Sequence, residues 1–145
     1  MSITSHQHVS RVVDFFENLS PDNLSSIPLI YADNAWFKDP FNEVRGVVEI
    51  NRIFAHMFLQ VDVPRFVVTS QTVENQSAFL TWDFRFRMKR FSTTGQSIRG
   101  ATHLHFNDAG LVTYHRDYWD AAEELYEKLP LLGGLMRLLK RAARN

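Results

Sequence analysis

The chain contains no cysteine among its 145 residues, which excludes a disulfide framework, a thiol nucleophile and a cysteine-ligated metal. It also lacks an apolar run of about 18 residues, so we expect no membrane-spanning helix. Residues 1–10 are polar and do not contain the apolar stretch of a secretion signal. Together these absences predict a cytoplasmic protein.

The chain also has no formal net charge, because Lys plus Arg number 16 and Asp plus Glu number 16. A balanced chain offers no extended field for nucleic acid, and we expect no nucleic-acid partner. Aromatic residues are abundant instead: twelve Phe, four Tyr and three Trp within a 45% hydrophobic composition. Large rings fill a core, and they also line apolar ligand pockets.

Three helices are predicted in the first half of the chain. Apolar residues recur at helical spacing over 8–19 and again over 47–60. A shorter helix is expected at 23–31, where Pro28 should make it irregular.

The second half is predicted to be a sheet. A short strand at 34–38 precedes the third helix, and turn-like links separate the strands that follow it. Those strands are expected at 65–74, 77–91, 96–106 and 111–119. Links this short predict an antiparallel meander.

The C-terminal end is predicted to be helical. Asp120 is a candidate N-cap for a helix at 121–129, and Pro130 separates that helix from a basic one at 135–144. Leucines and a methionine alternate there with basic residues: Leu131, Leu132, Leu135, Met136, Leu138 and Leu139 with Arg137, Lys140, Arg141 and Arg144. Packing on the domain is the favoured interpretation. The alternatives are an anionic membrane surface, a lid over a cavity, or a docked partner.

These elements predict one α+β domain over 1–145, with 130–145 as a basic C-terminal helical extension. The N-terminal helices would pack on the concave face of a curved antiparallel sheet. A curved sheet covered by helices leaves a cavity between the two layers.

Several segments resemble proteins of one superfamily. The stretch 31–40, followed by Arg45-Gly46, resembles the segment before the long helix of ketosteroid isomerases, and 107–112 resembles their last hairpin. Residues 116–120, Arg-Asp-Tyr-Trp-Asp, resemble the end of limonene epoxide hydrolases. The order of motifs over 8–129 is similar to that of SnoaL-like polyketide cyclases. The resemblance implies the cone-shaped fold of the nuclear transport factor 2-like superfamily.

The last hairpin indicates which residues face the cavity. A four-residue loop at 107–110 would place Thr102 opposite His115 and Gly100 opposite Asp117, and paired residues share a face. The more apolar face would then carry Ile98, Gly100, Thr102, Leu104, Thr113, His115, Asp117 and Trp119. His115 and Asp117 are the titratable groups of this face, which we assign to the cavity.

The strand at 77–91 allows two orientations. Hydrophobicity places Trp82, Phe84 and Phe86 inside, whereas the family's strand parity places Asp83 and Arg85 inside. A one-residue slip exchanges the two faces. We favour Asp83 and Arg85 inside, which would require a second copy of the chain to cover the aromatic face and so predicts a homodimer.

The resemblance also implies candidate catalytic residues. Asp39 matches the general base of ketosteroid isomerases, and its alternative role is to form a turn before Pro40. That chemistry also needs an oxyanion hole, but Phe15 and Thr102 occupy its Tyr and Asp positions, so we do not expect ketosteroid isomerase activity.

Asp117 matches the carboxylate that activates water in limonene epoxide hydrolases. Asp83-x-Arg85 supplies the residue types of that family's relay in reversed order, and His115 could serve as a second base. The alternatives are a structural ion-pair network and a hydrogen-bonded core histidine.

Two functions remain open. The first is an isomerase, cyclase or hydrolase that uses Asp117 and Asp39 on a small apolar or polycyclic ligand without a cofactor. The second is a non-catalytic ligand-binding or dimerisation module. The expected substrate-binding residues are Phe15, Trp36, Phe54, Thr102 and Trp119, with Trp36, Phe54 and Trp119 as apolar walls. His103 and His105 share a strand face but lack an evident third ligand, so no metal site is predicted.

Overall fold

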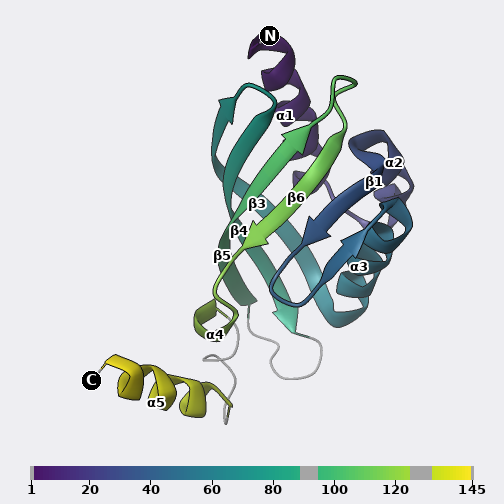
Figure 1. Ribbon diagram of the computed structural model, residues 1–145. Coiled ribbons are helices and arrows are strands. Elements are labelled where there is room, and N and C mark those ends of the chain that lie inside the picture. Colours follow the sequence, from purple (N-terminus) through teal and green to yellow (C-terminus); the bar gives the residue numbers. More distant parts are fainter. Residues whose placement is uncertain (1, 89–94, 125–131, 145) are drawn as a thin grey trace.

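A six-stranded curved sheet is the body of the protein, with its strands in the order β2-β1-β6-β5-β4-β3. Helices cover its concave face (Figure 1). This computed structural model describes residues 2–88, 95–124 and 132–144. The predicted α+β arrangement is confirmed.

The elements have the following bounds. The helical segments are α1 (Ser2–Glu17), the 3-10 helix η1 (Pro21–Ser26), α2 (Ile27–Ile30), α3 (Val47–Gln60), α4 (Ala121–Glu124) and α5 (Leu132–Arg144). The strands are β1 (Tyr31–Lys38), β2 (Glu43–Arg45), β3 (Val61–Glu74), β4 (Ser77–Met88), β5 (Gly95–Phe106) and β6 (Val112–Tyr118).

The third predicted helix has the bounds of α3, but the shorter helix expected at 23–31 is wrong in detail. It is divided into η1 and α2, consistent with the irregularity predicted at Pro28, and its last residue, Tyr31, begins strand β1. Strand β2 was missed because it has only three residues. The N-cap role of Asp120 is confirmed, since its Oδ1 accepts hydrogen bonds from the backbone N–H groups of Ala122 and Glu123.

The antiparallel meander is confirmed for β3 to β6, whereas β1 pairs with β6 in the parallel direction. Strand β3 begins at Val61 rather than at Arg65, because the chain passes Pro64 through a register shift. Proline has no N–H for a ladder hydrogen bond, and Val63 before it adopts φ 50°.

The core lies between the concave face of the sheet and the helices. Its largest fully buried side chains come from both layers and are Tyr31, Phe37, Ile27, Ile50, Leu80, Leu104, Val9, Val12 and Val112. The predicted amphipathic faces of α1 and α3 therefore meet the apolar face of the sheet.

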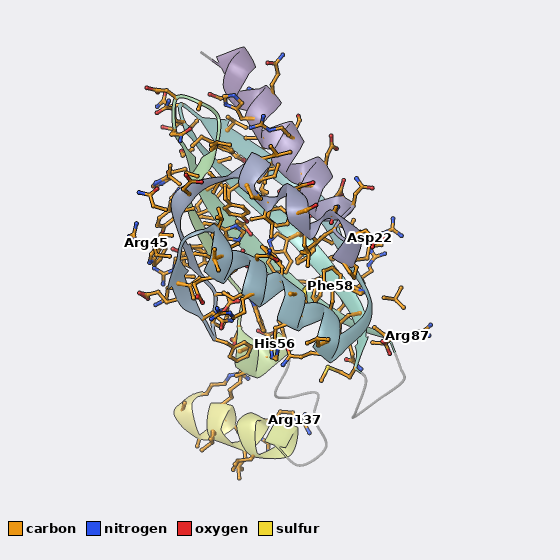
Figure 2. The ribbon with its side chains drawn as sticks, turned by 90° about the vertical axis from the view of Figure 1, so that its right-hand side faces the viewer. Asp22, Arg45, His56, Phe58, Arg87 and Arg137 are labelled. Atoms are coloured by element: carbon orange, nitrogen blue, oxygen red, sulfur yellow. The ribbon has the colours of Figure 1, made fainter. Side chains whose placement is uncertain are left out.

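The C-terminal helix α5 differs from the favoured prediction that it packs on the domain. Leu135, Leu138 and Leu139 keep 51%, 58% and 54% of their surface exposed. Figure 2, a side view turned by 90°, also shows α5 apart from the sheet and helices. In the part of the chain that the structure describes, no helix is long and apolar enough to cross a membrane.

Gly100 allows one close contact in the core. It faces Trp82 across the β4–β5 ladder, and a Cβ atom at this position would collide with the six-membered ring of the indole. Trp82 is only 7% exposed, so its ring has little room to move away. A side chain at position 100 would therefore displace Trp82.

We predict that Gly100→Ala lowers the free energy of unfolding by about 1–3 kcal/mol through overpacking. Urea denaturation measures this change. Gly95→Ala, on the same strand, is the matched control because no atom of the described residues contacts its added Cβ within 4 Å. Equal stability of the two variants would contradict the packing of Trp82 against Gly100.

Candidate functional site

The last hairpin brings His115 and Asp117 to the concave face. Thr102 pairs with Asp117 and Leu104 with His115, so the register differs by two residues from the predicted one. A shift of two residues preserves the faces of the side chains in this part of the ladder. The orientation of His115 and Asp117 is thus confirmed although their predicted partners are wrong.

An irregularity at the turn end of the hairpin explains the changed register. The ladder shifts between His105 and Phe106, and Phe106 pairs with Val112. As a result, Val112 rather than Thr113 contributes a fully buried side chain to the concave face. The hydroxyl of Thr113 instead donates to the backbone oxygen of His105.

The prediction for strand β4 is wrong. Phe84 pairs with Ile98, and Trp82, Phe84 and Phe86 face the core. Asp83 and Arg85 therefore lie on the outer face of the sheet, as a weak pair with 3.9 Å between Oδ2 and Nη2. Burying three aromatic rings is favourable, whereas burying two charged groups is costly, and this difference decides the orientation.

A chain of hydrogen bonds runs across the concave face through Asp117. The Trp82 Nε1–H donates to Thr102 Oγ1 over 2.8 Å, and the Thr102 hydroxyl donates to Asp117 Oδ1 over 2.6 Å. His115 Nε2 lies 2.7 Å from the same carboxylate oxygen. On its other side, His115 Nδ1 lies 2.8 Å from the hydroxyl of Tyr31.

The direction of these bonds fixes the tautomer of His115. Asp117 as a carboxylate only accepts, so His115 Nε2 carries a proton, and in the neutral imidazole Nδ1 then accepts from the Tyr31 hydroxyl. Tyr31 keeps its proton, because burial, and secondarily the charge of Asp117, raise the pKa of its hydroxyl well above 10.0. Every group in this series of hydrogen bonds thus has a consistent donor or acceptor role.

The imidazole of His115 is held from several directions. Its ring centroid lies 4.5 Å from that of Phe37 and 5.6 Å from that of Phe16, and the residue is 2% exposed. A ring packed this tightly cannot turn to present a nitrogen to the cavity. His115 therefore orients Asp117 rather than acting on a ligand directly.

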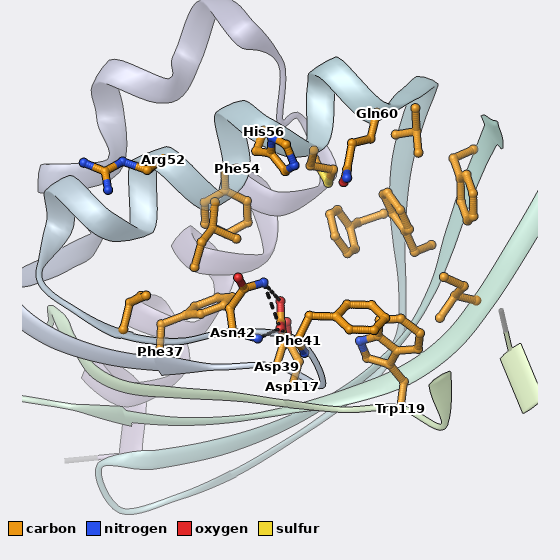
Figure 3. A pocket seen from close by; sticks show the side chains of 18 of the residues that line it. Phe37, Asp39, Phe41, Asn42, Arg52, Phe54, His56, Gln60, Asp117 and Trp119 are labelled. Carbon is orange, nitrogen blue, oxygen red and sulfur yellow. Dashed lines mark hydrogen bonds between the residues drawn. The ribbon is translucent and has the colours of Figure 1, made fainter. Parts of the chain in front are cut away.

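Asp117 is the acidic residue of this hydrogen-bond series, and its side chain reaches the cavity. Its side chain keeps 19% exposure, and it lines a hollow of about 730 Å³ between α3 and the sheet (Figure 3). Among the described residues, Asp117 Oδ2 accepts no hydrogen bond, and no Lys or Arg pairs with the carboxylate. This oxygen is therefore available to a bound molecule.

The cavity walls are mainly apolar, and aromatic rings are their largest class. The rings are Phe37, Phe41, Phe54, Phe66, Trp82, Phe84, Phe86 and Trp119. The polar side chains are fewer: Asp39, Asn42, Glu49, Arg52, His56, Gln60 and Asp117. An apolar hollow of this size with few polar groups has the properties of a small-molecule site.

Asp39 lines the same cavity, but its hydrogen bonds are those of a turn. Its Oδ1 accepts from the backbone N–H groups of Phe41 and Asn42 over 2.8 and 2.7 Å. The Asn42 amide donates to both carboxylate oxygens (dashed lines in Figure 3). The turn-forming role of Asp39 is thus confirmed.

The other predicted contacts divide into two groups. Phe54 and Trp119 line the cavity, and Thr102 lies one hydrogen bond behind it. Phe15 is buried against Phe16, away from the lining, and Trp36 stacks on Tyr114 on the outer face, with 4.9 Å between ring centroids. The prediction that Trp36 contacts a ligand in the cavity is wrong. Trp36 precedes Phe37, which faces the core, and neighbouring residues on a strand face opposite sides.

Sequence reasoning missed Tyr31 and Trp82 as parts of the site. Tyr31 was assigned to a helix, and Trp82 was placed on the outer face. Tyr31, Ala35 and Phe37 are all buried, but Asp33 between them is exposed, so the alternating pattern gave only a weak signal for the first. The hydrophobic pattern of strand β4 was the signal for the second.

His103 and His105 lie on the outer face, with 4.7 Å between their ring centroids. Burial, and then the neighbouring His105, lower the pKa of His103. Within the described residues, no group of three or more His, Asp or Glu side chains is placed to hold a metal ion.

The hydroxyl of Tyr31 supports a prediction about pH. An unfolded tyrosine ionises near pH 10.0, whereas Tyr31 in the fold remains protonated, so its stabilising contribution is complete below pH 10.0 and is lost above it. Tyr31→Phe should cost about 1 kcal/mol at neutral pH, and its deficit relative to wild type should shrink above pH 10.0.

Urea denaturation of both proteins across this pH range provides the measurement. Tyr118→Phe is the control, because this tyrosine is 43% exposed. A deficit of Tyr31→Phe that stays constant or grows with pH would contradict the buried, donating hydroxyl.

Comparisons with known proteins agree with this fold. Residues 12–115 match the family model described as a SnoaL-like domain. No protein of curated function matches the sequence. A protein named as a SnoaL-like polyketide cyclase from Jannaschia sp. CCS1 is similar in structure, with TM-score 0.72, 15% identity, and coverage of 83% of this chain and 88% of that one.

Two further solved structures have the same fold. An LEH-like epoxide hydrolase from M. tuberculosis has TM-score 0.68 and 12% identity, with 95% of this chain and 93% of that one covered. A hypothetical protein with a ketosteroid isomerase-like fold from Catenulispora acidiphila DSM 44928, in complex with trimethylamine, has TM-score 0.70 and 14% identity, with 81% and 88% covered. Identities this low establish a shared architecture only. The family match over most of the sheet and its covering helices shows that the chain belongs to the SnoaL-like domain family.

Proposed function

We propose that the protein binds a small, largely apolar molecule in the aromatic cavity and that Asp117 acts on it as a general base. One observation carries this proposal: Oδ1 of Asp117 is held by Thr102 and His115, while Oδ2 is left for the ligand. A carboxylate with one oxygen fixed and the other accessible is oriented for proton transfer.

The chemistry that fits is the movement of a proton. Asp117 Oδ2 takes a proton from a C–H bond of the ligand next to a carbonyl, leaving the electron pair in an enolate. In an isomerisation, the protonated carboxyl then returns the proton to another carbon. In a cyclisation by carbon–carbon bond formation, the enolate carbon attacks a second carbonyl, and the carboxyl gives its proton to the alkoxide oxygen that forms. Neither reaction changes the overall oxidation state. Apolar walls favour the reaction, because they exclude competing water.

Epoxide hydrolysis is supported less well. It requires an acid that protonates the departing oxygen as well as a base that activates water. The sequence offered Asp83 and Arg85 for the acid part, but both lie on the opposite face of the sheet from Asp117. We therefore assign no proton-transfer role to Asp83, Arg85 or Asp39, and we assign Asp39 to the shape of the cavity wall.

A binding protein without catalysis is the second candidate. It is favoured by the complete satisfaction of buried side-chain polar atoms within the described residues. The trimethylamine bound by the Catenulispora protein also suggests that this fold can hold a small ligand. In such a protein, Asp117 would accept a hydrogen bond or pair with a cation, without taking a proton.

Hydrogen–deuterium exchange tests the catalytic proposal without knowledge of the natural reaction. Cyclic enones and polycyclic ketones are incubated with the protein in D₂O, and exchange at the carbon next to the carbonyl is followed by NMR. Binding is measured separately from the fluorescence of Trp82 and Trp119, which both line the cavity. Asp117→Asn should slow exchange about 10²- to 10⁴-fold while ligand binding persists.

Asp83→Asn is the matched control, since it removes a carboxylate from the outer face of the same sheet. Its exchange rate should equal that of wild type. Exchange that is insensitive to Asp117→Asn would remove this residue from catalysis. A ligand that binds without any acceleration of exchange would favour the binding-protein candidate.

We also propose that a second copy of the chain covers the outer face of the sheet. The predicted reason for a dimer no longer holds, because Trp82, Phe84 and Phe86 face inward. Other rings occupy the outer face, however, and Phe79 and Tyr118 remain 45% and 43% exposed there. Exposed aromatic surface of this kind is typical of protein interfaces.

Phe79→Ser should shift the protein from dimer to monomer in sedimentation velocity. Leu59→Ser is the control, because Leu59 is 72% exposed on α3, away from the outer face. A wild-type protein that sediments as a monomer, or a dimer unaffected by Phe79→Ser, would contradict this arrangement.

A further inference from the structure

Helix α5 separates its apolar and basic residues on opposite sides. At about 100° per residue, Leu135, Leu138 and Leu139 fall within an arc of about 100°. The basic residues Arg137, Lys140, Arg141 and Arg144 fall within a similar arc of about 100° on the other side. The helix is thus amphipathic over its full described length.

The apolar side of α5 is not buried against the domain. All three leucines are more than half exposed, and α5 lies below the sheet and helices in both views (Figures 1 and 2). A stripe of exposed leucines in water is unfavourable, so this surface requires an apolar environment from outside the domain.

Charge distribution indicates the nature of that environment. Helix α5 carries four basic residues and no acidic one. Because acidic and basic residues number 16 each in the chain, the remainder has an excess of four acidic residues. The balanced total therefore hides a basic helix attached to an acidic domain. A surface that is both apolar and negatively charged complements α5.

We propose that α5 binds the surface of an anionic lipid bilayer, lying parallel to it with its leucines among the acyl chains. Basic residues opposite the leucines lie at the level of the lipid headgroups, where the long side chains of Lys and Arg reach phosphate groups. Thirteen residues form a helix of about 20 Å, which is shorter than the hydrocarbon core and fits the bilayer surface rather than a span. The acidic domain is repelled by the same headgroups and stays in water.

The entire 145-residue chain is tested by flotation with two kinds of vesicle, phosphatidylcholine alone and phosphatidylcholine mixed with phosphatidylglycerol. We expect flotation with the anionic vesicles at low salt, and its loss at about 1 M salt, where screening acts within about 3 Å. Flotation with neither vesicle would overturn the proposal, and so would equal flotation with both.

Two double variants separate the contributions of the two sides. Arg141→Gln with Arg144→Gln should weaken binding about fivefold for each charge removed. Leu138→Ser with Leu139→Ser should weaken it by more than about tenfold. Each has a control outside α5, Arg65→Gln for charge and Leu59→Ser for an exposed leucine, and both controls should bind as wild type does.

Circular dichroism melting should give the same transition for all these proteins, because α5 lies outside the core. Vesicle binding unaffected by either double variant would overturn the proposal by assigning the contact to another surface. A leucine variant that changes the sedimentation of the protein without vesicles, and leaves flotation unchanged, would also overturn it. That result would identify a second copy of the chain as the partner of α5.

Discussion

The hydrogen bonds that meet at Asp117 Oδ1 are the constraint on which the site depends. A carboxylate beside aromatic rings loses hydration, and this loss is offset only if donors replace the water. Thr102 and His115 supply these donors, and each is oriented in turn by Trp82 or Tyr31. The site is therefore held from four different parts of the chain, and Asp117 Oδ2 is the oxygen of this described network that remains for a ligand.

This network also joins the stability of the fold to the orientation of the site. Trp82 fills the core across Gly100, and the same indole donates to Thr102. The absence of a side chain at Gly100 thus determines where the hydroxyl of Thr102 points, and through it the position of Asp117. Packing and chemistry here are not separable contributions, because one ring serves both.

The sequence predicted the architecture and part of the site for different physical reasons. Amphipathic periodicity located α3, and the period of two along a strand placed His115 and Asp117 correctly despite a two-residue error in register. The same reasoning failed on β4, because an error of one residue in register exchanges the two faces of a strand. The strand parity of the family gave the wrong orientation there, and the hydrophobic pattern gave the right one. Trp82, Phe84 and Phe86 show that the burial of rings was the stronger guide. Tyr31 was not predictable from helical propensity, since its role depends on pairing between β1 and β6, which lie far apart in the sequence.

The state of the His115 ring gives the most direct test of this account. A long-range proton–nitrogen NMR spectrum of the ¹⁵N-labelled protein, assigned by comparison with His115→Gln, distinguishes the protonated ring nitrogen from the unprotonated one. At neutral pH we expect Nε2 to be protonated toward Asp117 and Nδ1 to accept from Tyr31. A proton on Nδ1 with none on Nε2, or the averaged signals of a ring that exchanges with water, would show that Asp117 is not held as described.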